Sequence, residues 1–250
     1  MIRIGTAGWS IPRESAAAFP GDGSHLARCA SVLRCAEISS SFHRSHRFST
    51  YARWAAQTPP GFRFSVKLPR AITHAGRLRD VEAPLAQFMS EVAGLGDRLG
   101  PLLVQLPPSL EFDTGVAADF FDRLHRLHRG DVVCEPRHSS WFEPAAEALL
   151  AACRAGRVAA DPARWPAAAR PGGWLGPAAD GIGATLYHRW HGAPRIYRSR
   201  YESEWIAQRA EAIRNLPAQA ECWCIFDNTA AGGAAGNALE LQALLDGAPR

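Results

Sequence analysis

The sequence predicts an α/β fold, a (β/α)8 TIM-like barrel that spans residues 1–250 as a single domain. Eight short apolar runs alternate with seven segments of helical pattern, which is the order expected for a parallel sheet with right-handed crossovers. A chain of 250 residues has room for eight such units in one closed barrel. No GxGxxG motif follows the first run, which disfavours an open dinucleotide-binding sheet.

The first four strand–helix units are delimited by prolines, a glycine and a capping residue. Pro59 and Gly61 stop the second helix, and Pro107 prevents extension of the fourth strand. Asp113 or Thr114 caps the helix that follows. The expected strands are residues 2–8, 35–41, 62–67 and 102–106, and the expected helices are residues 26–34, 48–56, 82–99 and 114–128.

The last four units are less regular. An apolar run within residues 132–141 ends at Glu135, and a helix follows from Pro144 to about residue 155. Residues 163–183 are rich in Pro, Gly and Ala without a helical pattern, so the sixth crossover is expected to be irregular. The remaining strands are expected at residues 158–160, 184–187 and 222–226, and the remaining helices at residues 202–215 and 237–245.

Composition restricts the class of protein. The net charge of +4 and the pI near 8.9 are mildly basic, and no run of about five like charges marks a nucleic-acid-binding tail. Six cysteines without paired CxxC motifs are expected to be buried thiols. No apolar run reaches the roughly 18 residues of a membrane span, and the amino terminus lacks a signal-peptide pattern. We therefore expect a cytoplasmic protein without a membrane partner. The sequence leaves the oligomeric state undefined.

Lys67 is the only lysine among 28 lysines and arginines. A GC-rich coding bias explains the excess of arginine and would leave a single lysine by chance. The other explanation is that the position needs a compact ammonium, or an amine that can lose its proton, which arginine does not supply. Lys67 closes the third predicted strand, so its position leaves the second explanation open.

Polar and aromatic side chains follow most of the predicted strands. The carboxyl ends of all strands of a parallel barrel meet at one mouth, where TIM-barrel enzymes hold their active sites. The candidate catalytic residues are Glu37, Glu135, Asp161 and His191. The candidate ligand-binding residues are Trp9, Lys67, Arg137, His138, Trp141, Tyr187, Arg189, Asp227 and Asn228.

Each of these residue types has a chemical and a structural interpretation. Glu37 and Glu135 either divide acid and base roles or form buried ion pairs with the nearby cations. Arginine forks suit a carboxylate or phosphate, and tryptophan faces suit a sugar or base, although each ring alone also fits a core position. His191, before Gly192, is either a general base or a histidine that bonds the neighbouring strand. A divalent metal is a further candidate, with a weak signal because HxH and HExxH spacings are absent. The cofactor is otherwise unknown.

A series of short motifs runs along nearly the whole chain. They are residues 5–9 (GTAGW), Glu37 with Phe42 and Arg44, residues 64–67 (FSVK), residues 100–109 (GPLLVQLPPS), Glu135, Arg137 and His138 with Trp141, Tyr187, Arg189, His191 and Gly192, and residues 226–228 (FDN) with Asn237. This series resembles the YecE-like family of uncharacterised TIM-barrel-like proteins. The resemblance implies a barrel with an irregular crossover after Asp161, and it implies no established reaction. Residues 39–43 (SSSFH) depart from the family's usual Asn-Ser-Thr-Phe-Tyr.

We therefore expect an enzyme, of hydrolase or isomerase type, that acts on an anionic ring-bearing small molecule by acid/base chemistry at the barrel mouth. A phosphorylated sugar or nucleotide fits this description. Arginines and Lys67 would hold the anion, and Glu37, Glu135 or His191 would transfer protons. One alternative is a metal-dependent nuclease or nucleic-acid-binding protein resembling endonuclease IV-like barrels. Another alternative is a non-catalytic ligand sensor.

Overall fold

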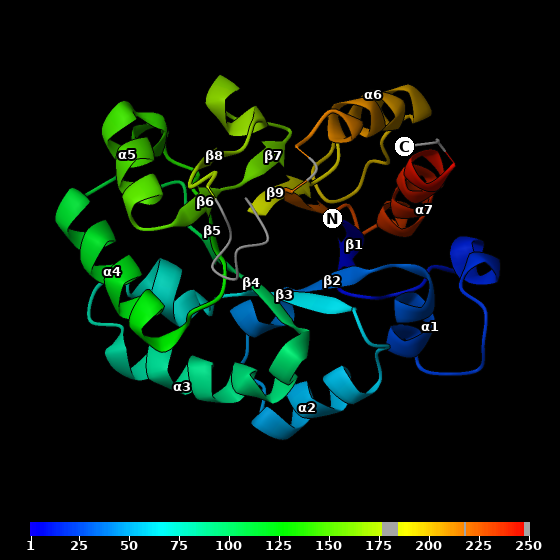
Figure 1. Cartoon of the computed structure of the whole chain (residues 1–250), viewed down its shortest axis with the longest axis horizontal. Helices are drawn as coiled ribbons and strands as arrows, with labels where there is room; N and C mark the ends of the chain where they lie inside the picture. The colour runs from blue at the N-terminus through cyan, green and yellow to red at the C-terminus, as the bar shows by residue number, and fades with distance from the viewer. Residues whose placement is uncertain (177–184, 218, 248–250) are drawn as a thin grey trace.

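Ten strand segments share one sheet in the order β7-β9-β10-β1-β2-β3-β4-β5-β6-β8 (Figure 1). Neighbouring segments are parallel, except for β6 with β8. The computed structural model describes residues 1–176, 185–217 and 219–247. The strands are β1 (Ile2–Ala7), β2 (Cys35–Ile38), β3 (Arg63–Lys67), β4 (Leu99–Gln105), β5 (Val132–Glu135), β6 (Ala155–Arg157), β7 (Ala159–Asp161), β8 (Gly172–Gly173), β9 (Thr185–Trp190) and β10 (Glu221–Phe226).

The α-helices in the described part of the chain surround the sheet (Figure 1). Asp113 starts α4 because its Oδ1 accepts a hydrogen bond from the backbone N–H of Val116 at 2.9 Å. Pro144 is the first residue of α5, where its missing N–H leaves no helical bond unmade. The helices are α1 (His25–Val32), α2 (Phe48–Ala56), α3 (Glu82–Val92), α4 (Thr114–Leu127), α5 (Pro144–Ala152), α6 (Ser203–Arg214) and α7 (Gly233–Asp246).

The sixth strand of the barrel is divided into two segments. β6 pairs with β5, and β7 pairs with β9. The chain runs from one segment to the other through Val158, so the two ends of the sheet are joined there by a single residue. The predicted eight-stranded TIM-like barrel is thus confirmed, in a nearly closed form, with β8 as a short antiparallel addition.

The sixth crossover contains no α-helix in its described part, residues 162–176, as the sequence predicts. It holds the 3₁₀ segment Pro166–Ala169 and the short β8. The rest of the irregular stretch, residues 177–183, and residue 184 of the predicted seventh strand lie outside the described residues. β9 continues to Trp190, beyond the predicted end at residue 187, because it pairs with β10 along its full length.

Several helices end earlier than the sequence predicts, and the difference is largest for α3. α3 ends at Val92, since a 3₁₀ segment follows in which Gly96 adopts φ 53°. β4 consequently begins at Leu99, ahead of the predicted residue 102. The register between β3 and β4 shifts beside Pro101. The missing N–H of this proline therefore interrupts no regular hydrogen bond between the two strands. α5 ends at Ala152 and β6 begins at once, inside the predicted helix.

Side-chain alternation along the strands separates an inner core from outer cores. The inner residues fill the barrel, and the intervening strand residues pack against the helices in two larger clusters. The amino-terminal end of the interior is closed where Arg3 lies over the ring of Trp223 and bonds Glu221. The inner cluster consists of Cys35, Leu103, Val133, Val158, Tyr187, Trp223 and Ile225.

Gly5 of β1 is required by the close approach of β2. A Cβ at this position would lie 2.1 Å from the carbonyl oxygen of Cys35, a backbone atom that cannot move alone. We expect Gly5→Ala to lower the free energy of unfolding by about 3 kcal/mol, as measured by urea denaturation. Gly115→Ala is the matched control, because its Cβ would meet nothing closer than 3.5 Å. Equal stability of the two variants would contradict this account.

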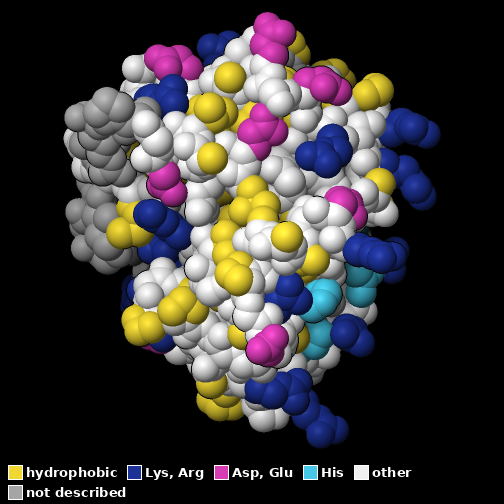
Figure 2. Space-filling model, turned by 90° about the vertical axis from the view of Figure 1, so that its right-hand side faces the viewer, with side chains coloured by type: hydrophobic (Ala, Val, Ile, Leu, Met, Phe, Trp, Pro, Cys, Tyr) yellow, Lys and Arg dark blue, Asp and Glu magenta, His cyan; other side chains and the backbone are white. Residues whose placement is uncertain are grey.

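The face formed over α1 and α7 carries a mixed surface (Figure 2). Apolar side chains gather in its middle, and basic and acidic side chains lie around them. No helix in the described ranges is both long and apolar enough to cross a membrane.

Candidate functional site

Side chains along each strand point alternately into and out of the barrel, and this alternation continues up to the barrel mouth. A residue two positions beyond an inner-cluster residue points into the same interior, one level nearer the carboxyl end. Lys67 holds the equivalent place on β3, two positions beyond Ser65, whose Oγ lies 2.5 Å from Tyr187 Oη inside the barrel. On five strands the residue at this level is polar, namely Glu37, Gln105, Glu135, Arg189 and Asp227.

Arg189 is the centre of this level, with only 2% of its surface exposed. Its Nε and Nη2 donate to the two carboxylate oxygens of Glu37 at 2.9 and 2.8 Å, a bidentate geometry. Nη1 donates to Glu135 Oε2 at 2.5 Å, and Nη2 also donates to Asp227 Oδ2 at 3.0 Å. One guanidinium thus links three carboxylates, and each of its three nitrogens donates to at least one of them.

Glu37 is fully buried and is surrounded by donors. Besides Arg189, Tyr187 Oη donates to its Oε2 at 3.0 Å and Ser39 Oγ donates to its Oε1 at 2.5 Å. The carboxylate therefore has no face open to solvent. Its place in the structure is that of an anchor for Arg189.

His191 joins two carboxylates of the network. Its Nδ1 lies 2.9 Å from Asp227 Oδ2, and its Nε2 lies 3.0 Å from Glu135 Oε1. Arg137 Nη2 donates to the same Glu135 oxygen at 2.9 Å. An imidazole with a carboxylate oxygen at each nitrogen is best satisfied as the doubly protonated cation.

The electrostatics of the network agree with this protonation state. Burial opposes a charge on His191, but the adjacent carboxylates prevail and raise its pKa above the ordinary 6.5. Burial alone would raise the pKa of Glu135, yet the surrounding arginines and His191 hold it well below its usual range. Arg189 and His191 likewise lower the pKa of Asp227 against the effect of burial. At neutral pH the acids are ionised, so His191 is the group that can give up a proton.

Arg137 and Lys67 are the cations nearest to solvent. The Arg137 side chain is 29% exposed, and it bonds Glu135 and Tyr197. Lys67 Nζ lies 4.0 Å from the ring centroid of Phe42 and makes no hydrogen bond or ion pair within the described ranges. Burial, followed by repulsion from the nearby guanidinium, lowers the pKa of Lys67 from 10.5 to about 8. Both cations are accessible to an anionic ligand.

Asp161 and Asn228 stand at strand exits but outside this network. Each is one position out of phase with the inward-pointing residues of its strand, so its side chain faces the surrounding segments. Asp161 Oδ1 accepts a hydrogen bond from Tyr201 Oη at 2.7 Å. Asn228 Nδ2 donates to Asn237 Oδ1 at 3.0 Å. Both residues fasten the segment between β9 and α6.

The predicted tryptophans pack into the outer core. Trp9 meets the rings of Trp54 and Phe64 edge-on, with centroids 5.1 and 5.9 Å away. Trp141 is 1% exposed and donates from Nε1 to the carbonyl oxygen of Leu110 at 3.0 Å.

Two further predicted ligand-binding residues have local structural contacts. His138 Nδ1 accepts from the backbone N–H of Ser140 at 3.3 Å and caps the 3₁₀ segment Ser139–Phe142. Tyr187 is 1% exposed and lies one level below the charged residues, where its hydroxyl supports Glu37. The residues brought together at the mouth are therefore Glu37, Lys67, Glu135, Arg137, Arg189, His191 and Asp227.

Sequence reasoning missed the aromatic residues that face the mouth. Phe42 belongs to one of the family motifs but was not a predicted ligand-binding residue. Its ring lies beneath the amine of Lys67. Tyr197 lies in the loop after β9, with its ring 5.6 Å from His191. No strand or helix pattern marks this loop, so the sequence holds no signal for Tyr197.

The donor set at the mouth does not fit a metal ion. Within the described ranges no group of three or more His, Cys, Asp or Glu side chains is arranged as a set of metal ligands. The physical reason is that the guanidinium of Arg189 occupies the space between the carboxylates. A cation there already neutralises the acids that a metal would need.

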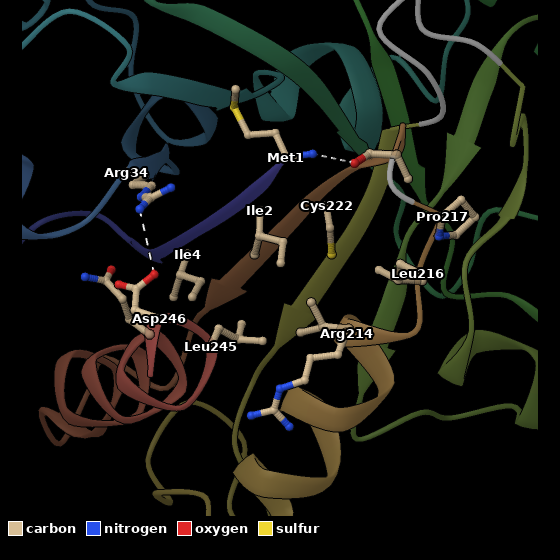
Figure 3. Close-up of a pocket in the computed structure, with 13 residues that line it drawn as sticks. Met1, Ile2, Ile4, Arg34, Arg214, Leu216, Pro217, Cys222, Leu245 and Asp246 are labelled. Carbon is tan, nitrogen blue, oxygen red and sulfur yellow. Dashed lines mark hydrogen bonds and ion pairs between the residues drawn. The ribbon is translucent and has the colours of Figure 1, made fainter. Parts of the chain in front are cut away.

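A pocket of about 470 Å³ opens at the other end of the barrel, near the amino-terminal ends of β1 and β10 (Figure 3). Its lining is mainly apolar, from Ile2, Leu216 and Leu245 among others, with Arg34 and Asp246 3.8 Å apart at one side. The Arg34 and Asp246 side chains are each 58% exposed, so water screens this ion pair. The charged network at the carboxyl end is therefore the candidate functional site.

Comparison with known proteins identifies the family. Residues 3–250 match the family model described as protein of unknown function DUF72. The chain belongs to the DUF72 family. This DUF72 protein is 29% identical over 107 residues to UPF0759 protein YecE of Escherichia coli, a match that covers 43% of the chain and 38% of YecE. The YecE-like resemblance predicted from the sequence is thereby confirmed.

Solved structures share the fold of this DUF72 protein. A DUF72 family protein from Enterococcus faecalis superimposes with a TM-score of 0.78 at 22% identity, covering 98% of this chain and 96% of that one. A DUF72 family protein from Thermotoga maritima gives a TM-score of 0.77 at 22% identity, covering 98% and 99%. These likenesses confirm the barrel.

Proposed function

We propose that the protein is an enzyme that binds an anionic, ring-bearing small molecule at the barrel mouth and transforms it by acid/base chemistry. A phosphorylated sugar or a nucleotide is the substrate class. The observation that carries the proposal is the placement of His191. It is held between two ionised carboxylates and beside Arg137, and the same two carboxylates act electrostatically on Lys67.

The anion would be held by Arg137 and Lys67. A guanidinium has five N–H donors, and the Arg137 side chain keeps 29% of its surface exposed after bonding Glu135. Lys67 adds a second positive charge without a carboxylate of its own. Two unlike cations, one forked and one compact, suit the oxygens of a phosphate or carboxylate.

The ring of the ligand would lie against Phe42 and Tyr197, the aromatic residues next to Lys67 and His191. His191 would act as the general acid, because the adjacent carboxylates raise its pKa and favour the protonated imidazole. Glu37 and Arg189 would position the acid from below without touching the substrate.

Arg137→Met should weaken anion binding by at least about tenfold, since it removes the exposed fork. The measurement is titration calorimetry with glucose 6-phosphate, ribose 5-phosphate and adenosine monophosphate. Glucose, ribose and adenosine serve as matched ligands without the phosphate. Failure of every phosphorylated compound to bind, or equal binding by wild type and Arg137→Met, would contradict the proposed function.

His191→Gln should leave the affinity of a bound compound within a few-fold but reduce its turnover by about 100-fold or more, because it removes the proton donor. Turnover is followed by phosphorus NMR and mass spectrometry. The wild-type rate should fall as pH rises through the raised pKa of His191. If a bound compound is left chemically unchanged by the wild type, the protein is the non-catalytic ligand sensor instead.

A further inference from the structure

Lys67 differs from the other charged residues at the mouth in having no charged partner. The carboxylates of Glu37, Glu135 and Asp227 are engaged by Arg189, Arg137 and His191. Within the described ranges the Lys67 amine makes neither a hydrogen bond nor an ion pair, and its one close contact is the face of Phe42 at 4.0 Å. The amine therefore has its nitrogen available for another group.

The backbone of Lys67, from which the amine extends, is held by hydrogen bonds. Lys67 is the last residue of β3, and its carbonyl oxygen accepts a hydrogen bond from Ser41 Oγ at 2.6 Å. The next residue continues the ladder, because the backbone N–H of Leu68 donates to Leu103 O at 2.9 Å. A nucleophile on a rigid strand end is held more accurately than one on a loop.

The surroundings also favour the uncharged amine. Burial lowers the pKa of Lys67 to about 8, and repulsion by Arg189 adds to this. The acids Glu37, Glu135 and Asp227 oppose the shift only in part. On the adjacent loop, His74 is kept neutral by its own burial and by Lys67, which together lower its pKa to about 4. About a tenth of the amine is uncharged at pH 7, far more than for an ordinary lysine.

We propose that Lys67 is a nucleophile that forms an imine with the carbonyl carbon of an aldehyde or ketone bearing a phosphate or carboxylate. The inference rests on the proposed function for the anion site at Arg137. It narrows the substrate class to carbonyl compounds, such as sugar phosphates in their open-chain form.

The chemistry balances without an oxidant or reductant. The nitrogen lone pair of Lys67 forms a bond to the carbonyl carbon, and the carbonyl oxygen becomes a hydroxyl by taking a proton from nitrogen. That hydroxyl takes a second proton from the cationic His191 and leaves as water. The product is a protonated imine, which withdraws electrons from the neighbouring carbon. His191, now neutral, can accept a proton from that carbon.

The sequence contains few amines that could react with an aldehyde, so a label can be assigned to one of two positions. Lys67 Nζ and the Met1 amino group are its only primary amines. The Met1 amine donates to Ala220 O at 2.7 Å, at the amino-terminal end of the barrel. The probe is pyridoxal 5′-phosphate, an aromatic aldehyde with a phosphate, and pyridoxal is the matched probe without it. Sodium borohydride reduces any imine to a stable secondary amine, which peptide mass spectrometry locates.

We expect at least tenfold more label on the Lys67 peptide than on the Met1 peptide at pH 7.5. Labelling should rise to half its maximum near pH 8. Lys67→Arg is the matched control, because it keeps the positive charge but cannot form an imine. It should abolish the label at this position.

The outcomes separate this inference from the proposed function. Lys67 labelled no more than Met1, with Arg137-dependent binding of phosphorylated compounds intact, overturns the imine and leaves the proposed function standing. Preferential labelling of Lys67 by both probes, with no effect of Arg137→Met on either, supports the imine and overturns the anion site. Loss of the preference for pyridoxal 5′-phosphate over pyridoxal in Arg137→Met supports both.

Discussion

Arg189→Met is expected to lower the free energy of unfolding by about 3–5 kcal/mol, because it leaves three buried carboxylates without their common cation. Glu37, with no exposed surface, and Glu135, with 2%, cannot recover the lost interaction from water. A loss of this size is a large part of the roughly 5–15 kcal/mol that stabilises a typical protein. The measurement is denaturant unfolding at pH 7, followed by circular dichroism.

The control for Arg189→Met is Arg123→Met. Arg123 also bonds two carboxylates, Asp119 and Glu82, but on the exposed surface of α4, where water compensates for the loss. Its removal should change stability far less. Adding Glu37→Gln and Glu135→Gln to Arg189→Met should restore part of the stability, because it removes two of the unpaired charges. Equal stability of Arg189→Met and Arg123→Met would show that the buried network stabilises the barrel no more than an exposed ion pair does.

The barrel itself could be predicted from the sequence because its signals are local. Alternating strand and helix patterns, and stops such as Pro59 and Pro107, need only neighbouring residues to be recognised. The departures have long-range causes. Val158 separates β6 from β7, because the chain changes partners there from β5 to β9, and no local sequence pattern marks that change.

The candidate site was predictable in its charged residues and not in its aromatic ones. Glu135, Arg189 and His191 stand at strand exits, and the barrel topology alone brings them together. Side chains alternate between the two faces of a strand. Once one inward-pointing residue of β10 is known, the sequence therefore also shows that Asp227 points inward and Asn228 points outward. Trp9 and Trp141 pack against residues of the outer core, and their position along the chain does not reveal which layer their rings occupy.

The distribution of charge at the mouth explains why Arg189 and Lys67 cannot exchange places. The planar guanidinium reaches three carboxylates at once and keeps its proton, so it organises the acids permanently. An amine at position 67 has no such partners and loses its proton readily. In a chain otherwise supplied with arginine, the proposed imine chemistry would require lysine at this place, because arginine stays protonated.

Lys67→Met is expected to raise the free energy of unfolding at pH 7 by about 2 kcal/mol, because the charged amine is less stable in the folded protein than in water. The pKa of Lys67 is about 8 in the folded protein, below the ordinary 10.5, so this cost is fully present below pH 8. Between these two pH values the unfolded chain binds more protons, and wild-type stability rises with pH. The advantage of Lys67→Met should therefore fade by about pH 10.

Lys67→Arg, which keeps its charge throughout, should show no such gain. Thermal and urea unfolding at pH 7 and pH 10 measure the difference, and a Lys67→Met variant less stable than wild type at pH 7 would show that the amine is kept for the fold and not for chemistry.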